Sequence, residues 1–84
     1  MLRRHRDLAW QQVGDELVVM NLPQGPVLGL NPTGALVFTL IEERDEDGLV
    51  AALVERFATD EPQARADVRG FVALLRERGL VSEV

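Results

Sequence analysis

With 84 residues, 46% of them hydrophobic, the chain is long enough for one small globular domain, which we expect to span residues 1–84. Cysteine is absent from the sequence, which excludes disulfides and thiolate chemistry, and no apolar run reaches the roughly 20 residues that cross a bilayer. The net charge of −5 disfavours nucleic-acid partners. The basic start MLRRHRDLAW lacks the apolar stretch of a signal peptide, and we therefore expect a cytoplasmic protein.

The sequence offers few groups for catalysis. His5 and Ser82 are its one histidine and its one serine, and they lie near opposite ends of the chain. A Ser-His-acid triad or a His/Cys metal site cannot be assembled convincingly from these two residues. The carboxylates occur in polar runs such as residues 42–48, without the apolar neighbours that would raise their pKa. We therefore expect no enzyme activity, no metal and no cofactor.

Two strands are predicted near the N-terminus, after a first segment, residues 1–7, that we expect to be flexible. Residues 8–14 and 16–22 read as strands, and Gly14 takes the first position of a two-residue type II′ turn between them. Trp10 is expected to anchor the first strand through its apolar ring. The second strand is apolar at almost every position, which predicts a strand that is covered on both faces.

A third strand is predicted over residues 26–30, after a turn at residues 22–25 that has proline and glycine where a type I turn places them. If tight hairpins join the three strands, the second lies between the others and the third keeps one free edge. Exposed strand edges are usually blunted by charge or proline; Pro26 begins this strand, and residues 27–30 after it carry no charge. Either a helix covers the edge, or an extended peptide pairs with it.

Three helices are predicted in the rest of the chain. Asn31 is a suitable N-cap for a helix that runs to about residue 43, and a second helix is predicted over residues 46–58. Asp60 with Gln63 resembles a capping box for the third, which Gly79 would end in a Schellman motif. The fold class is therefore α+β: a winged helix-turn-helix, with a three-stranded antiparallel sheet followed by three helices. The expected buried stripes are Leu36, Val37, Leu40 and Ile41; Leu49, Val50, Leu53 and Phe57; and Ala64, Val68, Phe71, Val72 and Leu75.

Two flanks of the third helix remain once the core is assigned. On one flank, Phe71 and Leu74 either widen the core or form the floor of a groove beside the third strand. Gly70 within the helix costs about 1 kcal/mol against alanine, which favours close approach of another group there. The same flank carries Asp67 and Arg78. The other flank presents an arginine row, which is either a solvated face or a contact for an acidic peptide or a phosphate: Arg65, Arg69 and Arg76.

The segments DELVVMNLPQGPVLGLNPTGALVFTLIEE, LVAALVERF and ADVRGFVALLRERGLV together resemble the PqqD-like proteins. These proteins are also called RiPP recognition elements, the leader-binding modules of ribosomally made, post-translationally modified peptides. The resemblance covers roughly residues 14–81. Its best landmarks are the LN-TG motif that opens the first helix (Leu30, Asn31, Thr33 and Gly34) and the DV--FV--L---GL pattern over residues 67–80.

The resemblance implies a module without catalysis that binds the leader region of a precursor peptide and serves a separate processing enzyme. The leader would add as an antiparallel strand to Val27, Leu28, Gly29 and Leu30, and its side chains would contact the face that contains Asp67, Gly70, Phe71, Leu74 and Arg78. The chain also resembles the free-standing element of lasso-peptide pathways, which hands the leader to a cysteine protease. A Tyr-x-x-Pro segment of such a leader would seat its ring and its proline in the apolar pocket.

Other functions remain open at this stage. A pyrroloquinoline-quinone chaperone of the PqqD type would share the fold, although such chaperones typically carry a PE element that NLPQGPVLGLNPTG lacks. A winged-helix DNA-binding protein would use the arginine row, against the acidic net charge. A homodimer could form if two exposed third strands paired with each other. No membrane partner is expected.

Overall fold

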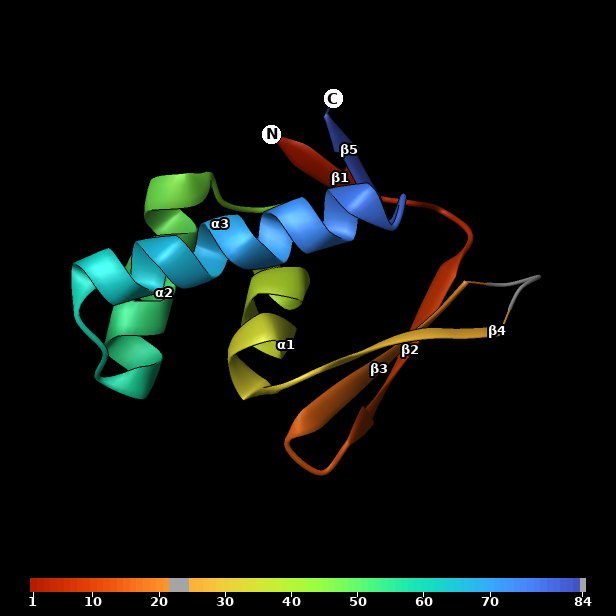
Figure 1. The fold of residues 1–84 in the computed structure, drawn as a ribbon, viewed down its shortest axis with the longest axis horizontal. Helices are drawn as coiled ribbons and strands as arrows, with labels where there is room; N and C mark the ends of the chain where they lie inside the picture. The colour runs from red at the N-terminus through yellow and green to blue at the C-terminus, as the bar shows by residue number, and fades with distance from the viewer. Residues whose placement is uncertain (22–24, 84) are drawn as a thin grey trace.

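The computed structural model describes residues 1–21 and 25–83, and the side chains of residues 25–27 also lie outside the description. The expected α+β class is confirmed, with a three-stranded antiparallel sheet followed by three helices in a winged-helix-like arrangement (Figure 1). No helix among the described residues is long and apolar enough to cross a membrane. The elements are β1 (Leu2–Arg4), β2 (Leu8–Val13), β3 (Glu16–Asn21), β4 (Gly25–Leu30), α1 (Pro32–Leu40), α2 (Glu46–Phe57), α3 (Glu61–Glu77) and β5 (Val81–Glu83).

The main sheet has the strand order β2-β3-β4. Pairing of Val13 with Glu16 leaves a two-residue turn, and Gly14 within it has φ +61°, a conformation that glycine adopts without strain. The predicted hairpin is thus confirmed. Residues 22–24 of the predicted turn between β3 and β4 lie outside the described residues.

The two faces of this sheet are covered unequally. Leu17 and Val19 of β3 are buried against the helices, whereas Val18 and Met20 on the opposite face are only half-buried. On the same outer face, Val13 is 53% exposed. The expectation that β3 is covered on both sides was therefore wrong, because α1 packs on only one side of the sheet.

The two chain ends form a second, two-stranded antiparallel sheet. β1 pairs with β5, with Leu2 opposite Glu83, and the His5 amide extends the contact by donating to the Leu80 carbonyl at 2.8 Å. Both ends lie together in Figure 1. Residues 1–7 therefore contain a strand, where we expected a flexible end. A three-residue strand carries too little periodicity to be recognised, and its partner is almost the whole chain away.

Arg4 ties this terminal sheet to α1. Its Nη1 donates to the carbonyls of Phe38 at 2.7 Å and Thr39 at 3.0 Å, both in the last turn of the helix. Its guanidinium also lies over the ring of Trp10, 4.8 Å from the centroid, and its backbone amide donates to Glu42 at 2.8 Å. The Trp10 ring meets Phe38 edge-on, although it stays 43% exposed. Trp10 thus contacts the core through its T-shaped pair with Phe38.

The helix ends agree closely with the local sequence signals. Asn31 caps α1, and the side chain of Asp60 accepts from the Gln63 amide at 2.8 Å. The Gln63 side chain, however, donates along the helix to Asp67 at 2.9 Å, so only half of the expected capping box forms. Gly79, with φ +71°, ends α3 in the predicted Schellman motif, since its amide donates to the Arg76 carbonyl and the next amide to that of Leu75.

The core lies between the three helices and the inner face of the sheet. Two details of the predicted stripes were wrong: α1 ends at Leu40 rather than near residue 43, and Phe57 is 38% exposed at the end of α2. The largest fully buried side chains are Phe38, Leu30, Ile41, Leu53, Leu75, Leu80, Val19, Val37 and Val68.

Candidate functional site

The free edge of β4 is the first component of the site. β4 pairs with β3 on one side, and no other strand among the described residues lies on its second side. Leu17 lies opposite Leu30 and Val18 opposite Gly29, so Leu30 points into the core while Gly29 faces outward. Leu28, which follows the same alternation as Leu30, is half-buried against the core. The backbone of this edge is thus held in register by β3 and by two anchored leucines.

Phe71 on α3 is the second component. Its ring is half-buried and lies against the backbone of Gly34, because a Cβ built on Gly34 would be only 2.6 Å from the Phe71 Cε1 atom. Gly34 is in the first turn of α1, which follows β4 directly after Asn31. This contact places the Phe71 flank of α3 next to the end of β4.

The remaining predicted residues of α3 continue along this flank. Asp67 and Leu74 are half-buried, and Asp67 Oδ1 accepts the hydrogen bond from Gln63. Gly70 is exposed, and a Cβ built there would meet no atom within 4 Å. The close approach that its small size suggested is therefore not made within the described chain, which leaves that space open. Arg78 is exposed at the C-cap of α3.

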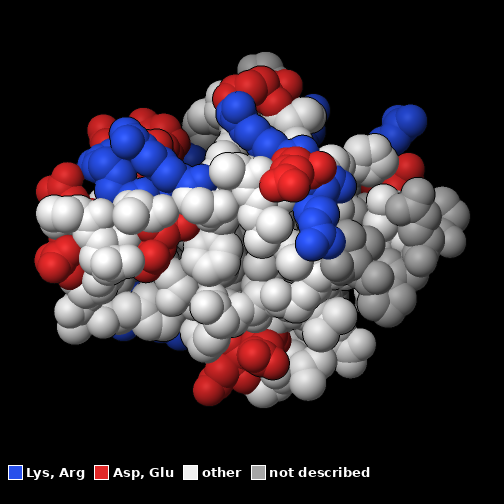
Figure 2. Space-filling model, in the orientation of Figure 1, with Lys and Arg blue, Asp and Glu red and all other residues white. Residues whose placement is uncertain are grey.

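Figure 2 shows how charge is distributed on the face that contains β4 and α3. Basic and acidic atoms lie side by side along the α3 side, and a separate acidic group lies over the turn between β2 and β3. The described surface between them is uncharged. An extended apolar segment could lie there without leaving a buried charge unpaired.

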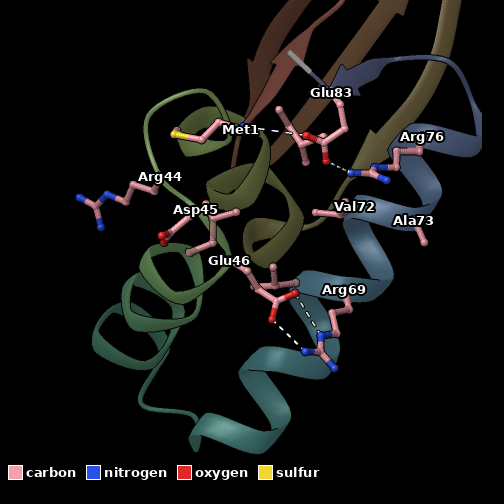
Figure 3. A pocket seen from close by; sticks show the side chains of 12 residues that line it. Met1, Arg44, Asp45, Glu46, Arg69, Val72, Ala73, Arg76 and Glu83 are labelled. Carbon is pink, nitrogen blue, oxygen red and sulfur yellow. Dashed lines mark hydrogen bonds and ion pairs between the residues drawn. The ribbon is translucent and has the colours of Figure 1, made fainter.

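The arginine row lies on the other flank of α3 and is engaged within the molecule. Arg65 donates to Glu46 at 2.7 Å, to Asp47 at 3.0 Å and to Glu61 at 3.0 Å. Arg69 donates through Nε and Nη2 to both carboxylate oxygens of Glu46 (Figure 3). The Arg69 guanidinium, followed by that of Arg65, holds the pKa of Glu46 below its ordinary value of 4.5. An anionic partner would have to displace these carboxylates.

A hollow of about 550 Å³ lies on this same flank, between α3, the start of α2 and the terminal strands (Figure 3). Arg76 donates to Glu83 at its rim, and the Met1 ammonium nitrogen lies 3.8 Å from the same carboxylate. Sequence reasoning missed this hollow because its walls come from both ends of the chain. Much of its wall is apolar: Leu2, Leu49, Val68 and Val72.

A winged-helix domain whose last main-sheet strand carries no charge and, among the described residues, has one edge without a partner strand is the arrangement expected of the PqqD-like proteins. The family model of Coenzyme PQQ synthesis protein D (PqqD) matches residues 16–81. The chain therefore belongs to the PqqD family, which confirms the resemblance seen in the sequence.

Two solved structures share the fold over nearly the whole chain. One is TbiB1 in complex with the TbiA(beta) leader peptide, with 24% identity, 98% of this chain and 96% of that chain covered, and a TM-score of 0.84. The other is lasso peptide synthetase B1 complexed with the leader peptide, with 20% identity, 98% of each chain covered and a TM-score of 0.82. No curated protein matches this sequence significantly.

Proposed function

We propose that this protein is a leader-peptide-binding module. It captures the leader of a ribosomal precursor peptide by strand addition to β4 and delivers it, without catalysis of its own, to a separate processing enzyme in the cytoplasm. The observation that carries the proposal is the free, uncharged edge of β4 beside the Phe71 flank of α3. Support comes from the two similar structures, both of which are complexes with leader peptides.

In this proposal the leader has two kinds of contact. Its backbone pairs with the edge formed by Val27, Leu28, Gly29 and Leu30, which supplies affinity with little dependence on sequence. Side chains at every second position face α3, where Phe71 and Leu74 offer apolar contacts and Asp67 a hydrogen-bond acceptor. Because ordering a flexible peptide costs several kcal/mol, we expect these side-chain contacts to decide which leader binds.

Two precursor classes are compatible with this module. Lasso-peptide processing is favoured by the similar structure of lasso peptide synthetase B1 with its leader peptide, and a leader protease would then be the enzyme served. A chaperone role in pyrroloquinoline quinone biosynthesis is favoured by the family description. The leader that binds would decide between them.

The first experiment is fluorescence anisotropy with a fluorescein-labelled synthetic leader of the precursor encoded beside this gene, and with a DNA duplex as control. Saturable leader binding without DNA binding is the expected result. Salt-sensitive binding of the duplex, with none of the leader, would contradict the proposal and favour a winged-helix DNA-binding protein. Sedimentation of the free protein would test whether two β4 edges pair in a homodimer instead.

Strand addition has a signature that can be measured without altering the protein. Successive amides of an added strand point alternately toward β4 and away from it. Leaders that carry one N-methyl group each should therefore lose about tenfold or more in affinity at every second position, because each such group removes one backbone donor and adds bulk at the pairing edge. Uniform losses, or none, along the leader would contradict strand addition.

The α3 flank can be tested with two neighbouring charges. Leu74→Glu places a carboxylate on the proposed contact surface and should weaken leader binding by at least about 1–2 kcal/mol. Ala73→Glu is the matched control, because Ala73 is exposed one residue earlier and lies at the hollow on the other flank. If both variants are folded by circular dichroism and bind equally well, the peptide does not contact Leu74. If Leu74→Glu binds normally but is less stable, Leu74 belongs to the core.

A further inference from the structure

Glycine at position 34 is explained by its lack of a side chain and not by its backbone conformation. It is buried in the first turn of α1, where its amide donates to Asn31 Oδ1 at 2.9 Å, and its φ is not positive. An alanine would suit this backbone better by about 1 kcal/mol of helix propensity. A Cβ there would however lie 2.6 Å from Cε1 of Phe71 and 3.0 Å from Cδ1 and Cζ.

The distances show that the aromatic ring occupies the place of a side chain at position 34. Ordinary contacts of a Cβ begin at 3.4 Å, so the closest ring atom is about 0.8 Å too near for a Cβ unless the ring or a helix shifts. The obstacle is a rigid ring on a half-buried residue rather than the mobile end of a long side chain. The position of the Phe71 ring therefore depends on the absence of a side chain at position 34.

We propose that Gly34 is a positioning residue for leader binding, in that its missing side chain lets Phe71 lie against α1 and keep the surface between α3 and β4 open. This inference rests on the proposed function. Gly34 need not contact the peptide itself; it acts through the ring of Phe71, which lies on the flank that we assign to the leader.

An alanine at position 34 has two ways to relieve the overlap, and both change the leader surface. The ring can turn away from α1, which carries it toward the place of the added strand. Alternatively, α3 can withdraw from α1, which changes its separation from β4. Since packed interiors do not absorb such a shift without strain, Gly34→Ala should lower leader affinity by about tenfold or more.

Gly48 provides a matched control within the same chain. It occupies the equivalent position in α2, where its amide donates to the N-cap side chain of Asp45 at 2.9 Å. A Cβ on Gly48 is also crowded, at 2.9 Å from Cβ of Arg44, but it does not meet Phe71. Gly48→Ala therefore introduces the same substitution at the same helix position, with milder crowding, and should leave leader affinity unchanged within about twofold.

The test is leader affinity of folded protein, measured by anisotropy with the same fluorescein-labelled synthetic leader. Phe71→Leu removes the Cε and Cζ atoms, so Gly34→Ala should cost less than about threefold in that background, against about tenfold alone. If the single Gly34→Ala variant does not fold, the double variant is compared with Phe71→Leu alone: a folded double variant that binds within about threefold supports the inference, and one that loses about tenfold overturns it. Equal losses from Gly34→Ala in both backgrounds, or folded Gly34→Ala that binds as tightly as wild type, would overturn the inference and leave the proposed function intact. Wild-type protein that does not bind the leader would overturn both.

Discussion

Arg4 should stabilise the folded protein through contacts that no sequence pattern indicates. Its side chain is 18% exposed and reaches from β1 to the last turn of α1, where carbonyls have no helical partner. Arg4→Met would keep the apolar stem and remove the charge and all donors. The Phe38 and Thr39 carbonyls would then lose a cationic partner at the negative end of the helix.

The magnitude follows from the individual contacts. Each hydrogen bond from a charged donor contributes about 1.5 kcal/mol or more, and stacking over Trp10 adds about 0.5–1 kcal/mol. The ion pair with Glu42, at 3.4 Å and partly exposed, adds little. Water can replace Arg4 at the carbonyl of exposed Thr39 but less readily at that of buried Phe38, and we expect a net loss of about 2–3 kcal/mol. A domain of this size has about 4–13 kcal/mol in total, so the effect is large.

Urea unfolding followed by far-UV circular dichroism measures this loss. With a slope of about 1 kcal/mol per M, the midpoint of Arg4→Met should fall by about 2–3 M. Arg4→Lys, which keeps the charge but loses the planar fork, should lose about 1 kcal/mol. Arg3→Met is the control, since Arg3 is exposed on the same strand, and it should change stability by less than about 0.5 kcal/mol. Equal midpoints for Arg3→Met and Arg4→Met would refute the reasoning.

Two further predictions concern the arginine row. The pKa of Glu46 is lowered in the folded protein, so its carboxylate contributes stability that is present above pH 4.5 and is lost as the pH falls through the lowered value. Glu46→Gln should therefore flatten the acid dependence of stability below about pH 4.5, and acid unfolding curves of unchanged shape would contradict this. Replacing Arg65, Arg69 and Arg76 together by glutamine should abolish any DNA binding but affect the leader only through its acidic residues. A drastic loss of affinity for a leader without acidic residues would contradict the proposed site, because it would show that the peptide contacts the arginine row and not the Phe71 flank of α3.

The elements of this fold could be predicted where the signal is local. Gly14 in its hairpin turn, Asn31 and Asp60 at their N-caps and Gly79 in its Schellman motif all lie within a few residues of the groups they bond. Such interactions involve residues that are close in the sequence, so they can be recognised from it, and they indicated where the main strands and the helices begin and end. The order of elements in turn identified β4 as an edge, and the family resemblance supplied its proposed role.

Contacts between distant residues could not be predicted in the same way. Whether the arginines face a partner or the protein itself depends on Glu46 and Glu83, which belong to other elements. The reason for glycine at position 34 becomes visible only when Phe71 lies beside it.

The sequence by itself therefore determined the three strands of the main sheet, the three helices, the fold class and the strand that we assign to the leader. Only the tertiary structure decided that the chain ends pair, that Arg4 bonds to α1 and that the arginine row is engaged by carboxylates. The physical reason is that turns and caps are formed by interactions among a few consecutive residues. The partner of a charge or of a ring is instead selected by the packing of the whole chain.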